Sequence, residues 1–387
     1  MRTPSQSAWR MVVGLGLVSL FADFTYEGGR SIGGPFLALL GAGPLLVGAV
    51  AGVGEFLGYL IRLFAGRWVD KSGRPWHLMY LGYTLNLLSV PALATAPSAG
   101  MAAVLLFLER LGKGLRTPAR DALLSHAGER LGQGRVFGLH ELFDQFGAFL
   151  GPLAVALLVG LGGYRLGFAG LLAPALLALF LLWRAHRHNG GAAAHSVVQD
   201  WEGLPRAYYA YLLFAMLAVA GFAHFQLVTY HLEVTQAVPA AHIPLLFALA
   251  MGADALAAYG AGHMFEHLGL RLLWGLPPLN LVAVTLFFLA KEPSLLGVAA
   301  VLWGCGLGLQ ESLMRSAVAV LSPPEQRGSA FGLFDTAFGG AWMLGSLAMG
   351  YLYSLAPGYL VAFGSLLQLA TTLFLARFYT LLPEVQR

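Results

Sequence analysis

The stretch "GRVFGLHELFDQFGAFLG" (residues 134–151) returns later in the chain as "GSAFGLFDTAFGGAWMLG" (residues 328–345). A second pair of loops, "GRWVDKSGR" (residues 66–74) and "GHMFEHLGLR" (residues 262–271), matches at nearly the same offset. A pattern that recurs at one offset is the sign of a duplicated structural unit. The matched positions in the first pair are Phe137 with Phe331, Gly138 with Gly332, Glu141 with Asp335 and Gly151 with Gly345. We therefore expect two related halves.

The composition indicates a polytopic membrane protein. Hydrophobic residues make up 58% of the 387 residues and charged residues only 11%, against roughly 25% charged in an average soluble domain. Cys305 is the only cysteine, which excludes an intramolecular disulfide and a thiolate metal cluster. The net charge of +4 is small, and we expect no nucleic-acid partner, no cofactor and no metal site.

Apolar runs of about 20 residues, the length that crosses the hydrocarbon core, predict an all-α fold of twelve transmembrane helices. The expected spans are residues 10–39, 45–65, 76–96, 99–118, 134–159, 164–184, 207–232, 241–262, 271–290, 294–318, 328–353 and 357–380. Most basic residues, Arg120 among them, fall in the loops and helix ends of one side, whereas the other side's loops hold only Arg165 and Lys291. Because positive loops stay cytoplasmic, we expect both termini in the cytoplasm.

The longest mostly polar run lies near the middle of the chain. It predicts a cytoplasmic linker at residues 186–206 between an N-terminal six-helix bundle, residues 1–185, and a C-terminal six-helix bundle, residues 207–387. The N-terminus has an apolar run without a small-residue cleavage site after it, so we interpret it as a retained first helix. His186, His188 and His195 in this region favour a solvated linker over a metal site.

Three motifs resemble those of the major facilitator superfamily. "GRWVDKSGRP" is similar to the signature loop between helices 2 and 3, and "FLERLGKGLRTPARDALL" is similar to the helix 4 motif in which Arg110 precedes Gly114 by four residues. "GAFLGP" resembles the start of the helix 5 motif of proton-linked exporters, although the downstream glycine pair is missing. "DFTYEGG" and "MGADALAAYGAG" are similar to a bacterial branch of permeases with members linked to nickel or drug export.

The resemblance implies a secondary transporter of the bacterial inner membrane, working by alternating access as a monomer and not as an enzyme. Its partners would be a small solute or ion, protons and lipid. In the signature loop it assigns a gating role to Gly66, Asp70, Lys71, Gly73 and Arg74. The helix 5 residues Gly147, Gly151 and Pro152 suit close packing or a hinge better than substrate contact.

Ionisable residues inside the expected spans are the candidates for proton coupling and substrate binding, because such residues are costly in a bilayer. Asp23, Glu27 and Arg30 are spaced by four and three residues and so share one face of helix 1. Glu109, Lys113 and Arg116 share a face of helix 4 in the same way. The full set is Asp23, Glu27, Arg30, Glu55, Arg62, Glu109, Arg110, Lys113, Arg116, Glu141, Asp144, His224, Asp254, Gln310, Glu311 and Arg315.

We predict a proton-coupled exporter in which Asp23 or Glu27 binds the driving proton. The pKa of a carboxyl group depends on its burial and on the distance to a cation, so movement of Arg30 or Arg110 would switch protonation. One alternative is a fixed ion-pair network that only joins the helices. Others are an uptake symporter for an organic anion, held by Arg30, Arg110, Lys113 or Arg116, and a non-transporting membrane sensor.

Overall fold

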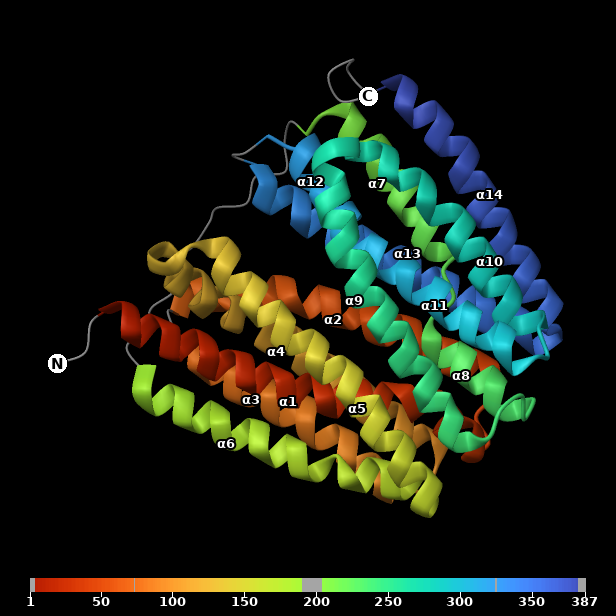
Figure 1. The fold of residues 1–387 in the computed structure, drawn as a ribbon, viewed down its shortest axis with the longest axis horizontal. Helices are drawn as coiled ribbons and strands as arrows, with labels where there is room; N and C mark the ends of the chain where they lie inside the picture. The colour runs from red at the N-terminus through yellow and green to blue at the C-terminus, as the bar shows by residue number, and fades with distance from the viewer. Residues whose placement is uncertain (1–3, 73, 190–203, 324–325, 382–387) are drawn as a thin grey trace. The chain divides into compact units, whose positions relative to one another are not determined.

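The computed structural model describes residues 4–72, 74–189, 204–323 and 326–381, and every regular element among them is helical (Figure 1). Helix bounds follow the apolar runs, with prolines at or near several helix starts, where a missing N–H costs no hydrogen bond. The helices of the first half are α1 (Pro4–Leu39), α2 (Pro44–Ser72), α3 (Pro75–Ala92), η1 (Leu93–Thr95), α4 (Ala99–Leu131), α5 (Gln133–Gly170) and α6 (Leu172–Asn189).

The second half contains more short elements. They are α7 (Arg206–Ala220), α8 (Phe225–Val234), η2 (Ala240–His242), α9 (Ile243–Leu268), η3 (Gly269–Gly275), α10 (Leu276–Leu289), α11 (Pro293–Leu309), the π-helical turn η4 (Gln310–Met314), α12 (Arg315–Leu321), α13 (Arg327–Leu355) and α14 (Pro357–Leu381).

Nine helical stretches of the described residues are long and apolar enough to cross a membrane. One of them, residues 133–187, covers two expected spans, and its kink at Gly163 (φ 73°) separates them. Expected spans 99–118 and 328–353 are helical, in α4 and α13, but are not among the nine. The all-helical fold is therefore confirmed, and the count of twelve stays a prediction.

Contacts divide the chain into two compact units, each described here by itself. Unit 1 comprises residues 1–41, 57–197 and 240–248, and unit 2 comprises residues 42–56, 198–239 and 249–387. The division into bundles 1–185 and 207–387 stays a prediction, and residues 190–203 of the expected linker, with His195, lie outside the described residues.

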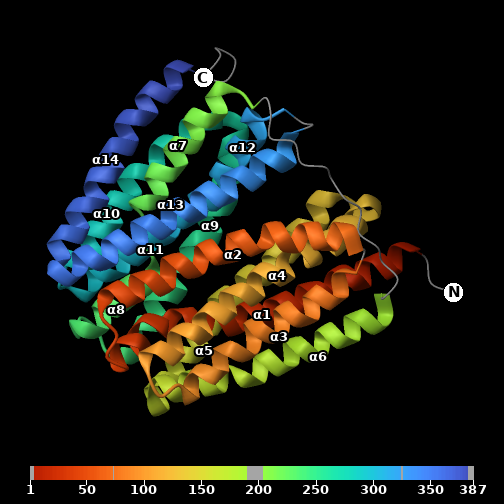
Figure 2. The same cartoon turned by 180° about the vertical axis from the view of Figure 1, so that it is seen from behind.

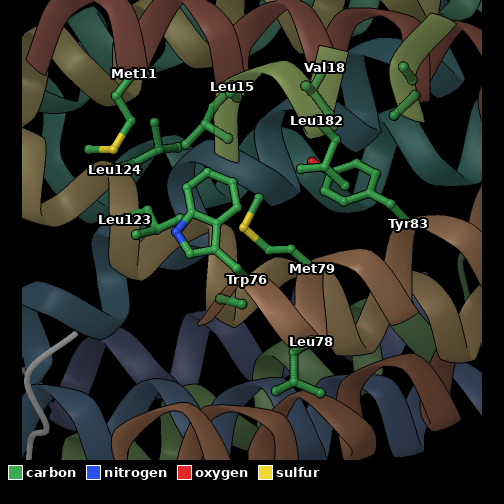
Figure 3. Packing of buried hydrophobic residues seen from close by; sticks show 14 of the residues in the cluster. Met11, Leu15, Val18, Trp76, Leu78, Met79, Tyr83, Leu123, Leu124 and Leu182 are labelled. Atoms are coloured by element: carbon green, nitrogen blue, oxygen red, sulfur yellow. The ribbon is translucent and has the colours of Figure 1, made fainter. Parts of the chain in front are cut away.

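In unit 1, α1 packs against α4, α5 and α6, and α3 packs against α4 (Figures 1 and 2). Figure 3 shows part of the apolar core that these helices share, including Met11 and Leu15 of α1, Trp76 of α3 and Leu123 of α4. This core packs the first half of α1 against α3, α4 and α6. It therefore fixes the helices that carry the polar side chains of unit 1. In unit 2, α7 packs against α13 and α14, and α10 packs against α11 and α14.

Close glycine contacts repeat between the units. A Cβ on Gly151 would meet the carbonyl oxygen of Phe24, and a Cβ on Gly345 would meet that of Ala220. Each glycine therefore lets two helix backbones touch. The residue numbers of the glycines differ by 194, and those of their partners by 196, so the same α5 to α1 contact recurs as α13 to α7.

A second pair of contacts follows the same rule. Gly114 of α4 lies against the carbonyl oxygen of Gly58, and Gly308 of α11 lies against that of Asp254. The offsets are again 194 and 196. The repeat inferred from two sequence motifs is thus visible as matched backbone contacts, and it assigns a counterpart in unit 2 to each position of unit 1.

The expected span 207–232 is not one continuous helix. It is interrupted at residues 221–224, between α7 and α8. Side chains replace helical hydrogen bonds there: Trp303 Nε1 donates to the carbonyl of Ala223 at 2.8 Å, and the backbone N–H of Gln226 donates to His224 Nδ1 at 3.2 Å. Such breaks inside apolar protein survive only where neighbouring groups satisfy the backbone.

Candidate functional site: a charged network in unit 1

A buried ion pair of unit 1 joins α1 to α4. Asp23 Oδ1 lies 3.5 Å from Arg116 Nη2, and the two residues are 6% and 1% exposed. The Arg116 guanidinium carbon also lies 4.5 Å from the centroid of the Tyr83 ring, whose face attracts cations. Asp23 and Arg116 therefore depend on each other for charge compensation in a site with little water.

Tyr26 links the same carboxylate to a second cation. Its hydroxyl donates to Asp23 Oδ2 at 3.1 Å and accepts from Lys113 Nζ at 2.6 Å. The Lys113 ammonium lies 4.0 Å from the Tyr26 ring centroid. A proton change at Asp23 would thus be felt by both Arg116 and Lys113, which lie one helical turn apart on α4.

A second group of polar contacts joins α5 to α1 and α4. Ser19 Oγ lies 2.8 Å from His140 Nε2, and His140 Nδ1 lies 3.4 Å from Asp144 Oδ2. Arg120 Nη1 lies 3.5 Å from the same Asp144 oxygen and donates to Ser19 Oγ at 3.4 Å. The two groups of contacts lie next to each other on α1 and α4, because Ser19 and Asp23, like Arg120 and Arg116, are four residues apart in one helix. We call them together the charged network: Ser19, Asp23, Tyr26, Lys113, Arg116, Arg120, His140 and Asp144.

Two further ion pairs lie beside the charged network. Arg30 Nη1 donates to Glu27 Oε1 at 2.9 Å within α1. Arg110 Nε lies 3.2 Å from Glu109 Oε2 on α4. Asn86 of α3 donates to both the carbonyl and the Oε1 of Glu109, at 3.1 and 2.9 Å.

The other predicted residues of unit 1 lie apart from this network. Arg62 lies over the Tyr59 ring, with its Cζ 5.0 Å from the centroid. Glu141 is exposed and accepts from Gln145 at 3.2 Å. In the gating loop, Gly66 and Lys71 belong to α2 and Arg74 precedes α3, while Gly73 and the side chain of Asp70 lie outside the described residues.

The helix 5 residues lie against α1. A Cβ on Gly147 would meet the backbone of Leu20 and Phe24, as Gly151 does one turn further on, and Pro152 is buried inside α5. This close approach brings Asp144 of α5 to the face of α1 that carries Ser19 and Asp23.

The sequence candidates of unit 2 lie on α2, at the helix break, on α9 and in or beside η4. Glu55 Oε1 lies 3.5 Å from His224 Nε2 at the helix break. Asp254 of α9 and Gln310, the first residue of η4, are buried. The remaining two candidates, Glu311 and Arg315, are exposed, and Arg315 Nη2 lies 3.6 Å from Asp335.

One sequence expectation is wrong. Arg120 was expected among the basic residues of loops and helix ends, but α4 continues to Leu131 and the Arg120 side chain is only 14% exposed. Its ion pairs with Asp121 at 2.9 Å and with Asp144 explain why it is tolerated there. Tyr26 and Ser19 were missed because neither side chain carries a charge; their spacing of three and four residues from Asp23 was the available signal.

Comparison with known proteins identifies the family. A model of the Major Facilitator Superfamily matches residues 17–346. The chain belongs to the Major Facilitator Superfamily. An uncharacterized protein of Mycobacterium tuberculosis is 39% identical over 371 residues, covering 92% of this chain and 90% of the relative. An uncharacterized MFS-type transporter of Methanocaldococcus jannaschii is 26% identical over 372 residues, covering 93% of each.

Solved transporters of the superfamily share the fold. The structure of a POT family transporter in complex with a thioalcohol-conjugated peptide superposes with a TM-score of 0.81 at 13% identity, covering 97% of each chain. At that identity the likeness concerns the fold alone. Together with the membrane-length helices, superfamily membership makes this protein a multi-pass membrane protein and a secondary transporter of a small solute.

Proposed function

We propose that this superfamily member is a proton-coupled exporter in which Asp23 binds and releases the driving proton. The observation that carries the proposal is the buried contact of Asp23 with Arg116, supported by the Tyr26 hydroxyl that joins Asp23 to Lys113. Asp23 contacts Arg116 of α4 directly and is joined to Lys113 of the same helix through the Tyr26 hydroxyl. Glu27, the other predicted proton site, forms an ion pair with Arg30 of its own helix.

Protonation of Asp23 changes the forces between α1 and α4. A neutral carboxyl group no longer compensates Arg116, and a buried cation without a counter-charge is strongly destabilising. The protonated form therefore favours an arrangement in which α1 and α4 have moved relative to each other. Release of the proton restores the ion pair and the first arrangement, which is the two-state behaviour that alternating access needs.

The alternative of an organic-anion symporter finds less support. It requires arginines able to turn to a carboxylate or phosphate of the substrate. Arg30, Arg110 and Arg116 each already lie within 4 Å of a protein carboxylate. Export is favoured over uptake by the "GAFLGP" resemblance in α5. In this proposal the protein acts as a monomer in the bacterial inner membrane with both termini in the cytoplasm, and residues 66–74 gate the cycle.

Proton movement in proteoliposomes tests the proposal. Vesicles that contain the full chain and an internal pH dye are given ethidium, nickel(II) or succinate as probe solutes. We expect ethidium or nickel(II) to move protons in the direction opposite to the solute, and Asp23→Asn to abolish this signal. Glu27→Gln should retain it.

Two results would contradict the proposal. Proton movement in the same direction as succinate would establish the symporter. Full proton movement in the Asp23→Asn variant would place the coupling site elsewhere. Asp335→Asn, at an exposed ion pair of unit 2, serves as the control for a carboxylate lost outside the network.

A further inference from the structure

Unit 2 contains an uncharged counterpart of the charged network. Counted with the offsets fixed by the glycine contacts, 196 on the first two membrane helices of each half and 194 on the later ones, Tyr26 corresponds to Phe222 and Asp144 corresponds to Phe338. By the same count Asp23 becomes Val219, Glu109 becomes Trp303 and Arg116 becomes Gln310. The position that is ionic in unit 1 is therefore aromatic and amide-bearing in unit 2.

The two buried asparagines make this correspondence concrete. Asn86 and Asn280 differ by 194, and each lies against a glycine of the next helix, Gly112 and Gly306 respectively. Asn86 has Glu109 as its partner. In the second half, Trp303 stands at the position that corresponds to Glu109. Neither Oδ1 nor Nδ2 of Asn280 has a hydrogen-bond partner among the described residues.

A group of aromatic rings begins next to this amide. Phe222, in the break between α7 and α8, lies within 3.6 Å of the position of a Cβ on Gly306, the same glycine that Asn280 contacts. Its ring stacks on Trp303 with centroids 5.0 Å apart, and it lies 6.2 Å from the ring of Trp342. We call Phe222, Trp303, Trp342, Asn280 and Gln310 the ring-and-amide cluster.

Several polar atoms of the cluster are buried and unpaired. In addition to the Asn280 amide, Gln310 Oε1 and Trp342 Nε1 have no partner among the described residues. Asn280, Gln310 and Trp342 are 1%, 3% and 6% exposed. Burying a polar group without a hydrogen bond costs roughly 1–3 kcal/mol, and buried polar groups in proteins are normally satisfied by protein, water or ligand. Ligand-binding sites are typically lined by aromatic and apolar side chains with a few polar groups that orient the ligand. Unpaired donors and acceptors beside stacked rings match that composition.

We propose that the ring-and-amide cluster is the substrate subsite of unit 2 and that it receives a flat, uncharged aromatic ring with hydrogen-bond donors and acceptors on its edge. The inference rests on the proposed transport function, to which it adds the substrate class. The rings supply stacking faces. The Asn280 amide, with two donors and an acceptor, reads the edge of the ligand. The charged network of unit 1 would then bind the proton, and the ring-and-amide cluster of unit 2 would bind the solute.

Calorimetric titration of the purified full chain in detergent tests this subsite. The probes are phthalimide, whose edge has an N–H and two carbonyl groups, N-methylphthalimide, which lacks the N–H, and methyl glucoside, a ring with hydroxyls but no aromatic face. We expect phthalimide to bind, N-methylphthalimide to bind about tenfold more weakly through the lost hydrogen bond, and methyl glucoside not to bind.

Two variants separate recognition from a structural role. Asn280→Leu should weaken phthalimide binding about tenfold while the unfolding temperature stays equal or rises, because the substitution removes an unpaired buried amide. Trp342→Phe should act likewise on binding, since its Nε1 is unpaired. Trp303→Phe is the matched contrast: it loses the bond to Ala223 and should lower the unfolding temperature.

The inference is overturned if phthalimide does not bind, if Asn280→Leu lowers the unfolding temperature without changing the affinity, or if methyl glucoside binds in its place. These measurements need no proton gradient. Proton-coupled flux without phthalimide binding would contradict the subsite and leave the proposed function standing. Phthalimide binding without proton-coupled flux would support the subsite and contradict the proposed function.

Discussion

Asp23 and Arg116 form an ion pair whose side chains are 9% and 1% exposed, whereas Asp335 and Arg315, at nearly the same distance, are 25% and 50% exposed. The difference in burial decides the energetics. Removing one partner of a buried pair costs about 3–5 kcal/mol, since an uncompensated charge remains. An exposed pair contributes roughly 0–1 kcal/mol.

We therefore expect Asp23→Asn to lower the free energy of unfolding by about 3–5 kcal/mol. The double variant Asp23→Asn with Arg116→Met should recover most of this loss, because the charge itself is gone. Thermal and denaturant unfolding in detergent measure both, with Asp335→Asn as the control. A double variant that is less stable than the single one would mean that Arg116 has further partners that matter more than Asp23.

Tyr26→Phe removes the hydroxyl group with its two hydrogen bonds and leaves the charges of Asp23 and Lys113 in place. The Asp23 carboxylate loses a donor and Lys113 loses an acceptor. Loss of a donor disfavours the ionised carboxylate, so Asp23 would hold its proton up to a higher pH. We expect the midpoint of the pH profile of solute-driven proton movement to rise, with transport retained at low pH. Thr25→Ser, at the preceding position of α1, is a control, because it keeps the hydroxyl that donates to the carbonyl of Phe21. An unchanged midpoint would remove Tyr26 from the coupling path.

The matched glycine contacts predict matched effects. Gly151→Ala and Gly345→Ala each place a methyl group on a backbone carbonyl of the neighbouring helix, and overpacking costs typically about 1–3 kcal/mol. Gly138→Ala has nothing within 4 Å of the new Cβ and should stabilise its helix by about 0.5–1 kcal/mol. Unfolding temperatures of the three variants check this. Equal behaviour of Gly138→Ala and Gly151→Ala would contradict the close α1 to α5 contact.

Asn86 offers the reverse of the Asn280 experiment. Asn86→Leu deprives the buried Glu109 of two hydrogen bonds, and leaving such an acceptor unsatisfied costs about 1–3 kcal/mol. We expect Asn86→Leu to lower the unfolding temperature, whereas Asn280→Leu should leave it equal or raise it. A stable Asn86→Leu variant would show that other groups around Glu109 replace the amide.

The sequence was sufficient to predict the fold class and the duplication, because both depend on long-range periodicity in apolar and glycine positions. The face of α1 that carries Asp23 followed from helical spacing alone. The partners of Asp23 did not, since Arg116 and Lys113 both lie on the predicted face of α4 and spacing cannot choose between them. Uncharged members such as Tyr26 and Ser19 have only their spacing from Asp23 as a sequence signal, and that spacing does not distinguish them from other residues on the same face of α1.

Unit 2 was predicted less well. Its candidates were chosen for charge, so Glu311 and Arg315 were included although both are exposed. The aromatic residues beside Asn280 resembled ordinary apolar core. Their connection to the charged network became visible only when the glycine contacts fixed the offset between the halves. The break between α7 and α8 also has no strong signal, as Gly221 and His224 stand in an otherwise continuous apolar run.

The break at residues 221–224 has a mechanical consequence. With 15 and 10 residues, α7 and α8 are roughly 22 and 15 Å long at 1.5 Å per residue, each shorter than the hydrocarbon core. Neither helix crosses the bilayer alone, so the two must cross it one after the other. The indole of Trp303 on α11 is hydrogen-bonded to the break between them. A movement of α11 would therefore act first on residues 221–224, through the hydrogen bond from Trp303 to Ala223.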